Sequence, residues 1–364
     1  MRGLSAVPSY VIMQPTTLCN LDCRYCYLPH RAADRRMPVE VAEAVAASVN
    51  DWAAAADRFS VVWHGGEPLA AGRAQLAALM APFEGVEHHI QTNATLIDDA
   101  WCDFFLTHDV HVGLSLDGPR SHTSGRVLRG GREAYDRIIA GIDTLHRRGI
   151  DFALLAVVSD PGPGMADALY TFLAGLRPTV IAVNLEEQEG VNLRSNDHDS
   201  DRVRAFWAEL TAAWRRDPRI EVREVEWALR FAGAALAGEQ DQLLPRRHDP
   251  IPTIAHDGGV VLLSPELAGF TSARYGDFTS GSVRDTPLHE IVAAAADRPT
   301  GWVAEYLAGV EGCRVSCDYF GFCGGAHAAN RYFEHGRFDT TRTRHCHNSR
   351  ISLLEGVLDH ARGS

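Results

Sequence analysis

The sequence predicts an α/β fold: a partial barrel of about six strand–helix units followed by a smaller C-terminal domain. Two observations predict it. Short apolar runs alternate with helix-forming runs up to about residue 215, as in a parallel sheet with right-handed crossovers. The eight cysteines, with one exception, form two groups near opposite ends of the chain. Six units are fewer than the eight of a complete βα barrel, so we expect an incomplete, TIM-like (β/α)6 barrel.

The alternation can be followed along the chain from the first strand. We expect strands at 9–15, 59–69, 87–93, 110–119, 151–159 and 179–187. We expect helices at 38–56, 74–83, 97–108, 132–149 and 166–176. Pro38 stands where a first helical turn tolerates proline, and Gly149 closes an amphipathic helix. We therefore divide the chain into a barrel (1–220), a helical bridge (221–250) and a C-terminal domain (251–364).

Composition and charge narrow the partners and the compartment. A net charge of −12 argues against nucleic acid or an anionic membrane as the main partner, because both require basic surfaces. The first residues lack the apolar core of a signal peptide, and no apolar run approaches the roughly 20 residues of a membrane span. We therefore expect a cytoplasmic protein, in which clustered cysteines bind metal or do chemistry more often than they form disulfides.

The first cysteine group lies in "TTLCNLDCRYCYLPH", residues 16–30. Three explanations compete for it: buried small hydrophobes, a disulfide framework, and a metal or cluster site. The spacing C-x3-C-x2-C cannot complete a four-cysteine zinc site locally. It can hold three irons of a cubane cluster and leave the fourth open to a small molecule. Cys102, alone among apolar neighbours, is expected to be a buried structural cysteine.

Unusual residues follow most of the expected strands. The strand ends carry the cysteine segment, "HGGEP", "QTN", "SLDGP" and "NLEE". Ligands of such folds bind at the carboxyl ends of the strands, so these segments should converge on one mouth.

These residues carry a resemblance. Cys19, Cys23 and Cys26, with "HGGEP" one strand later, resemble the motifs of radical S-adenosylmethionine (radical SAM) enzymes. The resemblance implies a [4Fe–4S] cluster on the three cysteines, whose unique iron binds SAM. Reduction of the cluster would then release a 5′-deoxyadenosyl radical that abstracts a substrate hydrogen.

The same resemblance implies roles for residues at the mouth. Gly65 and Gly66 would let the backbone approach the methionine ammonium, helped by Glu67. Arg126 is our choice for the methionine carboxylate, because a guanidinium suits carboxylate geometry, and Arg129 is the competitor. The remaining residues expected around SAM are Asn93, Ser115 and Asn184. The carboxylates that could accept a substrate proton are Asp117, Glu186, Glu187 and Glu266, of which the pair in "NLEEQEG" is the most attractive.

The second cysteine group reads C-x3-C-x5-C-x22-C. Four thiolates also suit a zinc ribbon. The stretch nevertheless resembles the auxiliary-cluster region called SPASM in radical SAM peptide maturases, which implies a second [4Fe–4S] cluster on Cys313, Cys317, Cys323 and Cys346. A full SPASM region usually holds two auxiliary clusters, but Ser264 stands where a further cysteine is expected, after a β-hairpin. We therefore expect two clusters in total.

Over nearly its whole length the chain resembles Grr-type maturases, which form cyclophane crosslinks in ribosomal peptides. The resemblance implies a precursor peptide as substrate and an electron donor such as flavodoxin or ferredoxin. No leader-binding module fits before the first strand, so a peptide would dock on the two domains or be brought by a partner. The alternatives are modification of a small molecule, such as a nucleoside or sugar nucleotide, with the auxiliary cluster as electron acceptor or sulfur source, and an electron carrier that never cleaves SAM.

Overall fold

A nine-stranded, mostly parallel sheet forms the centre of the computed structural model, which describes residues 3–56, 58–194, 197–244 and 247–362. The six expected strands are present as β1 (Tyr10–Met13), β2 (Ser60–Trp63), β3 (Glu87–Thr92), β4 (Val110–Ser115), β5 (Phe152–Val158) and β6 (Val180–Leu185). Consecutive strands among them are parallel neighbours, so their carboxyl ends meet at one edge. The predicted partial barrel is confirmed.

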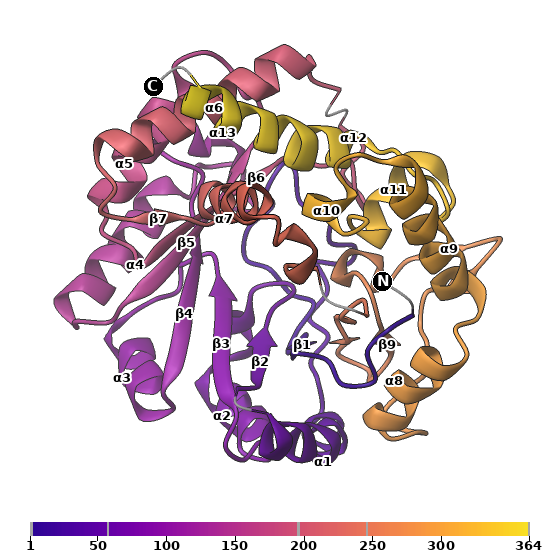
Figure 1. Ribbon diagram of the computed structural model, residues 1–364. Coiled ribbons are helices and arrows are strands. Elements are labelled where there is room, and N and C mark those ends of the chain that lie inside the picture. The colour runs from indigo at the N-terminus through magenta and orange to yellow at the C-terminus, as the bar shows by residue number, and fades with distance from the viewer. Residues whose placement is uncertain (1–2, 57, 195–196, 245–246, 363–364) are drawn as a thin grey trace.

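Helices cover the outside of this sheet (Figure 1). They are α1 (Val39–Ala55), α2 (Arg73–Met80), α3 (Asp99–Thr107), α4 (Tyr135–Arg147), α5 (Met165–Gly175) and α6 (Ser200–Arg216). Every second residue of β5 is buried, from Phe152 to Val158. This alternation leaves one face of the strand for the core and the other for the interior of the barrel. Cys102 in α3 is fully buried, as expected.

The sheet does not close: further strands extend both of its edges, and the two outermost of its nine strands are not paired with each other. The short β7 (Glu221–Val222) pairs with β6, while β8 (Thr253–Ile254) adds to β1 in parallel and turns back as β9 (Val260–Val261). The expected hairpin before Ser264 is therefore present and belongs to the barrel sheet. The domain division at residue 251 stays a prediction.

The C-terminal part is mostly helical and lies beside the barrel (Figure 1). Its helices are α8 (Leu288–Asp297), α9 (Gly301–Ser316), α10 (Phe320–Cys323), α11 (Ala328–His335), α12 (Arg344–Cys346) and α13 (Ser352–Arg362), with the two-stranded β10 (Thr271–Ser272) and β11 (Gly276–Asp277). Helix α7 (Arg223–Ala237) occupies much of the segment between the two parts. The shorter helical turns are η1 (Pro68–Ala71), η2 (Thr123–Gly125), η3 (Gln240–Gln242), η4 (Pro265–Leu267) and the π-helical η5 (His347–Ile351).

The last helix returns to the barrel and packs on α6 (Figure 1). A Cβ atom on Gly356 would lie 2.5 Å from the carbonyl oxygen of Arg204, so glycine permits this close approach. Arg204 pairs with Glu355 at 3.1 Å, and Trp207 Nε1 donates to the carbonyl of Asn348 at 3.0 Å. These contacts fix the C-terminal cysteines relative to the barrel. Within the described residues, none of the helices combines the length and apolar character needed to cross a bilayer.

Candidate active site

The three N-terminal cysteines lie in the loop that follows β1, at the carboxyl edge of the parallel strands. The Cys19 amide donates to the Arg31 carbonyl at 2.9 Å, and the Cys26 amide donates to the Cys23 carbonyl at 3.2 Å. Arg129, the competitor of Arg126 for the methionine carboxylate, instead donates through Nε to the Cys19 carbonyl at 2.8 Å. The loop is therefore held by its own backbone and by a cation from the segment after β4.

The sequence "HGGEP" brings the loop after β2 against this cysteine loop. Gly66 has a φ of +61°, and a Cβ there would lie 2.6 Å from the carbonyl oxygen of Leu18 and 2.7 Å from that of Thr16. Only glycine combines this backbone conformation with such an approach. The Glu67 amide then donates to Leu18 at 2.8 Å. Gly66 thus shapes the cysteine loop, and the predicted contact of Gly65 and Gly66 with SAM stays a prediction.

Within the described residues, no three cysteine sulfurs of either group all lie within 4.8 Å of one another. The assignment of a [4Fe–4S] cluster rather than a zinc ion to each group stays a prediction.

Burial makes the N-terminal thiolates dependent on a bound cation. It raises the pKa of Cys19 to about 12, reinforced by the nearby Glu67, and the pKa of Cys23 to about 11. Burial also raises the pKa of Cys26. A metal bound by these sulfurs would have to displace these protons.

The side chain of Glu67 is hydrogen-bonded within the protein. Its buried carboxylate accepts hydrogen bonds from the Thr92 hydroxyl at 2.6 Å, the Asn93 amide at 2.8 Å and the Leu69 amide at 3.0 Å. These bonds join the carboxyl ends of β2 and β3. They leave Glu67 committed to the protein, so we expect it to act on SAM through the loops that it holds.

Two other expected SAM residues lie at the carboxyl ends of β3 and β4. Asn93 Nδ2 donates to Asn20 Oδ1 at 2.9 Å and lies 3.9 Å from the Cys19 sulfur. Ser115, at the end of β4, accepts a hydrogen bond from Gln91 Nε2 at 3.0 Å. Asn93 is thus next to the cysteine loop, while Ser115 lies one strand further along the sheet.

Asp117 and Arg126 form a buried, bidentate ion pair, with nitrogen–oxygen distances of 3.0 and 2.8 Å. The Val157 amide donates to the same carboxylate at 3.0 Å, and the Tyr25 hydroxyl also donates to it. We expected Asp117 at the mouth as a proton acceptor, but its two oxygens already accept these four bonds. Arg126 uses Nε and one N–H of Nη2 in the pair, so Nη1 and the second N–H of Nη2 are left for a methionine carboxylate.

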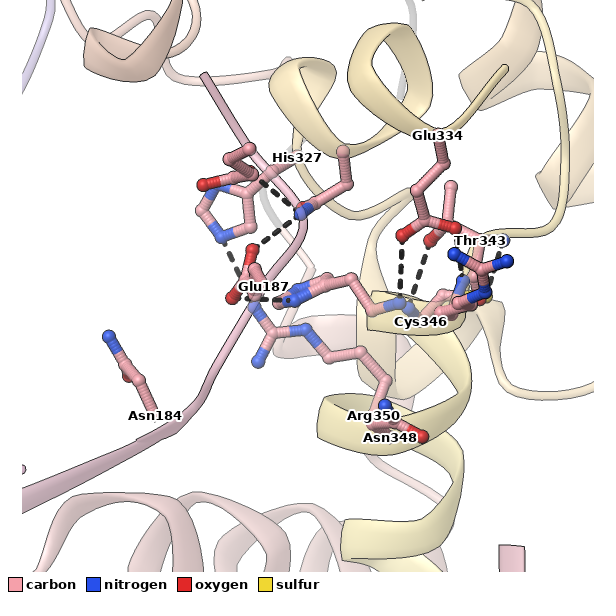
Figure 2. Close-up of polar contacts among 12 residues, drawn as sticks. Asn184, Glu187, His327, Glu334, Thr343, Cys346, Asn348 and Arg350 are labelled. Carbon is pink, nitrogen blue, oxygen red and sulfur yellow. Dashed lines mark hydrogen bonds and ion pairs between the residues drawn. The ribbon is translucent and has the colours of Figure 1, made fainter. Parts of the chain in front are cut away.

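Glu187, just beyond β6, reaches across to the C-terminal helices (Figure 2). Its carboxylate lies 2.9 Å from His345 Nδ1 and accepts a hydrogen bond from Asn330. Although burial opposes ionisation, His345 and Asn330 lower the pKa of Glu187 to about 2. Burial and the neighbouring Glu187 raise the pKa of Glu189 well above its usual range. Glu187 is therefore an ionised link between the two parts of the protein.

Glu186 and Asn184 have different partners. Glu186 is buried, accepts a hydrogen bond from Asn192 Nδ2 at 3.1 Å, and lies 3.5 Å from Arg194 Nε. Asn184 lies apart from Glu187 (Figure 2), and its Oδ1 accepts from Arg223 Nη2 at 2.9 Å. The structure therefore does not gather Asn184, Glu186 and Glu187 into one cluster.

Glu266 is the candidate whose carboxylate has a fully buried oxygen, Oε2, without a hydrogen-bond partner among the described residues. Burial raises its pKa to about 7, with a contribution from Glu187. The loop that carries it packs on the other loops of the mouth, since a Cβ on Gly190 would lie 2.1 Å from the Tyr27 carbonyl and 3.0 Å from the Phe270 ring.

Sequence reasoning missed a polar pair at the mouth. The Tyr27 hydroxyl lies 3.3 Å from His64 Nε2, and burial lowers the pKa of His64 to about 4, so this imidazole is neutral. Tyr27 directly follows Cys26, and His64 directly precedes Gly65. Their places beside the two motifs were the available signal.

All four C-terminal cysteines line one pocket, formed by the end of α9, α10 and α12. Buried Arg331 donates to the Cys313 sulfur at 3.3 Å, and the Thr343 amide donates to the Cys346 sulfur at 3.3 Å. Burial raises the pKa of Cys313 and of Cys346, but the cation and the backbone donor beside their sulfurs would stabilise the negative charge of a thiolate-bound cluster. The donor set therefore fits a second cluster.

Ser264 has a position of its own. It is fully buried, and its hydroxyl accepts a hydrogen bond from the Ala329 amide at 3.1 Å, in the first turn of α11. The bond satisfies an amide that would otherwise lack an intrahelical partner. This role agrees with the expectation of two clusters, not three, and the count stays a prediction.

A cavity of about 320 Å³ lies next to the C-terminal cysteine pocket. The two share Cys323, Ala326 and Arg350 as wall residues. Aromatic residues form much of the cavity wall, namely Tyr10, Trp227, Phe231, Tyr306 and Phe322. The Arg350 guanidinium lies 4.3 Å from the centre of the Trp227 ring. A ligand in this cavity would therefore touch both aromatic faces and the edge of the second cysteine site.

Comparison with known proteins relates the barrel to an enzyme superfamily. Residues 13–167 match the family model of the radical SAM superfamily. An uncharacterized protein of Synechocystis, sll1766, is 32% identical over 96% of this chain and 90% of its own length. The serine-type anaerobic sulfatase-maturating enzyme of Klebsiella aerogenes is 34% identical, but the match spans only 62% of this chain and 60% of that enzyme.

Solved structures share the fold over most of the chain. A histidine-tagged form of anSMEcpe with bound AdoMet has a TM-score of 0.75 at 19% identity, and the match covers 98% of each chain. Streptococcus suis SuiB bound to its precursor peptide SuiA has a TM-score of 0.65 at 18% identity, covering 94% of this chain and 76% of SuiB.

Proposed function

The chain belongs to the radical SAM superfamily, and from this premise we propose that it crosslinks side chains, in a cyclophane-type reaction, within a ribosomally made precursor peptide. With its cluster and SAM bound, the barrel supplies a 5′-deoxyadenosyl radical that removes a substrate hydrogen atom. We assign the cluster to Cys19, Cys23 and Cys26. The residues that we assign to SAM are Gly65, Gly66, Asn93, Ser115, Asn184 and Arg126 through Nη1 or the second N–H of Nη2.

The observation that carries the peptide proposal is the aromatic cavity beside Cys323. Its volume of about 320 Å³ falls within the usual size of ligand pockets, and its aromatic walls suit an aromatic side chain. Arg350 lies between this cavity and the cysteine pocket, where it can contact the polar backbone of a bound peptide. Related enzymes that mature sulfatases, and the precursor-peptide complex of SuiB, support a peptide or protein substrate.

The proposed crosslink must dispose of one electron and one proton. Hydrogen abstraction leaves a carbon radical, and its addition to an aromatic ring forms the new bond. The ring then regains aromaticity by losing one electron and one proton. A second [4Fe–4S] cluster on Cys313, Cys317, Cys323 and Cys346 would supply the electron acceptor, and an external donor such as flavodoxin or ferredoxin would supply the electron that cleaves SAM.

We propose Glu266 as the acceptor of that proton. The other three carboxylates have polar partners: Asp117 pairs with Arg126, Glu187 pairs with His345, and Glu186 contacts Asn192 and Arg194 through Oε1. Glu266 has a buried oxygen without a hydrogen-bond partner among the described residues and a pKa of about 7, so it can gain and lose a proton near neutral pH. Glu187 is a poorer base because its pKa is about 2.

An assay with defined peptides tests the proposed function. Anaerobically reconstituted enzyme, SAM and dithionite are incubated with short peptides that contain Trp, Tyr or Phe, and with matched peptides that contain Leu instead. We expect 5′-deoxyadenosine together with loss of two hydrogen atoms from an aromatic peptide, and tandem mass spectra that lack fragmentation inside the crosslinked loop.

The same assay separates the competing reactions. Oxidation of a serine or cysteine to an aldehyde also removes two hydrogens, but its product reacts with a hydrazide and fragments normally. SAM cleavage with every peptide unchanged would favour a small-molecule substrate. No cleavage of SAM under any condition would favour an electron carrier.

A further inference from the structure

Three side chains with metal-binding atoms gather at the amino ends of β3 and β4, opposite the cysteine loop. Glu87 and His89 are two positions apart on β3, so they share one face of the sheet. His111 on β4 is the register partner of His89. Two residues on one strand and their cross-strand neighbour form a compact triangle on the sheet. The backbone register itself therefore places the three side chains together.

The distances within this triangle match a metal ion better than a hydrogen bond. One ligand atom from each of the three side chains lies within 4.8 Å of the other two. His89 Nε2 and Glu87 Oε2 are 3.6 Å apart, which is too long for a hydrogen bond. Two ligands that lie 2.0–2.1 Å from a tetrahedral metal are about 3.4 Å apart. The His89 and His111 rings stack with their centres 4.6 Å apart, so the two imidazoles lie side by side.

The electrostatics also favour a cation at this position. His89 Nε2 faces Glu87 Oε2, so an imidazole nitrogen and a carboxylate oxygen lie on the same side of the triangle. Glu87 contributes a negative charge. The Nε atom of Arg58 is 3.9 Å from Glu87 Oε1, but the Arg58 side chain is 85% exposed, so it competes weakly with a metal ion for this carboxylate. Since the three ligands are partly or fully exposed, an ion can enter from solvent.

We propose that Glu87, His89 and His111 bind one divalent transition-metal ion, such as Zn²⁺, with water completing its coordination. Two imidazoles and a carboxylate are a common nitrogen and oxygen ligand set for such ions. In the described part of the chain, this is the one group of three or more His, Cys, Asp or Glu side chains with ligand atoms so close together. The site does not depend on the proposed peptide reaction.

Zinc titration of the enzyme with both cysteine sites loaded with iron and sulfide tests the proposal. We expect calorimetry to show one zinc equivalent in the parent that is lost in His89→Ala and His111→Ala. The equivalent should bind at least tenfold more weakly in Glu87→Gln. His335→Ala, which removes an exposed histidine elsewhere, is the matched control and should keep the equivalent. Zinc X-ray absorption of the loaded parent should show nitrogen and oxygen neighbours and no sulfur.

Two results would overturn the proposal. One is a parent that binds no zinc equivalent beyond those retained by a His89→Ala/His111→Ala double variant. The other is a sulfur shell around zinc, which would place the ion on cysteines. Unchanged 5′-deoxyadenosine formation in all variants shows that they are folded and carry the first cluster, so a loss of zinc binding reports the site itself.

Discussion

Replacing Glu266 with glutamine should stabilise the protein at alkaline pH while it abolishes the product. The folded protein raises the pKa of this carboxyl from 4.5 to about 7 because the group is buried. The protonated carboxyl of Glu266 therefore contributes fully to the stability of the fold below about pH 4.5, and this contribution is lost as the pH rises through about 7. At about pH 8.5 the ionised carboxylate lowers the free energy of unfolding by about 3 kcal/mol. Each tenfold change in the acid dissociation constant between the unfolded and folded states corresponds to about 1.4 kcal/mol.

Glutamine has the same shape but cannot ionise, so Glu266→Gln removes this cost. For a chain of 364 residues, about 3 kcal/mol corresponds to a rise of about 4 °C in melting temperature. By the same linkage, the gain should fall to about 1 kcal/mol, or about 1 °C, at about pH 5.5. Differential scanning calorimetry at both pH values measures the gain, and Glu290→Gln on the exposed face of α8 is the matched control.

The catalytic half of the prediction uses the same variant. Loss of a general base costs about 10²–10⁴-fold in rate, so product formation should fall at least 10²-fold while 5′-deoxyadenosine is still released. The product rate of the parent should rise with pH through about 7, and that dependence should vanish in Glu266→Gln. Equal melting temperatures of parent and variant at about pH 8.5, or product formed at the parent's rate, would refute the reasoning.

Three further predictions concern the clusters. Each of Cys19→Ala, Cys23→Ala and Cys26→Ala should abolish 5′-deoxyadenosine formation without unfolding the barrel; substantial SAM cleavage by any of them would contradict the cluster assignment. Reconstituted parent should contain about eight irons and eight sulfides per chain, as two cubanes require. About four irons with one zinc would indicate a zinc ribbon, and about twelve irons a third cluster. The Cys317→Ala/Cys323→Ala double variant should still cleave SAM, at a reduced rate, and make no final product, which paired chromatography of both compounds measures; product at the parent's rate would exclude a role for the second site.

The barrel could be predicted from the sequence because its signals are local. Apolar runs such as that of β5 alternate with helices, and turn residues such as Gly66 mark the strand ends. The cysteine spacing likewise lies within short segments. The hairpin of β8 and β9 is local and was expected, but the pairing of β7 with β6 and of β8 with β1 carries no comparable signal, because each joins segments distant in the chain.

The roles of the charged residues could not be predicted in the same way. Both Asp117 and Arg126 follow β4, but nothing in the sequence shows that they neutralise each other. The pairing of Glu187 with His345 joins segments 158 positions apart (345 minus 187) and fixes the ionisation of Glu187. The packed structure determines which carboxylate keeps an oxygen without a partner. The sequence could therefore include Glu266 among the candidate proton acceptors but could not select it from them.

The most direct test of the central claim follows one hydrogen atom. An aromatic peptide that the enzyme modifies is synthesised with deuterium on the carbon from which the radical takes the hydrogen atom, not on the aromatic ring. One reaction is then analysed for both 5′-deoxyadenosine and the crosslinked peptide. We predict that 5′-deoxyadenosine gains one deuterium and that the crosslinked peptide loses it. Unlabelled 5′-deoxyadenosine from a reaction that yields crosslinked peptide would contradict the claim that the radical generated at Cys19, Cys23 and Cys26 performs the crosslink.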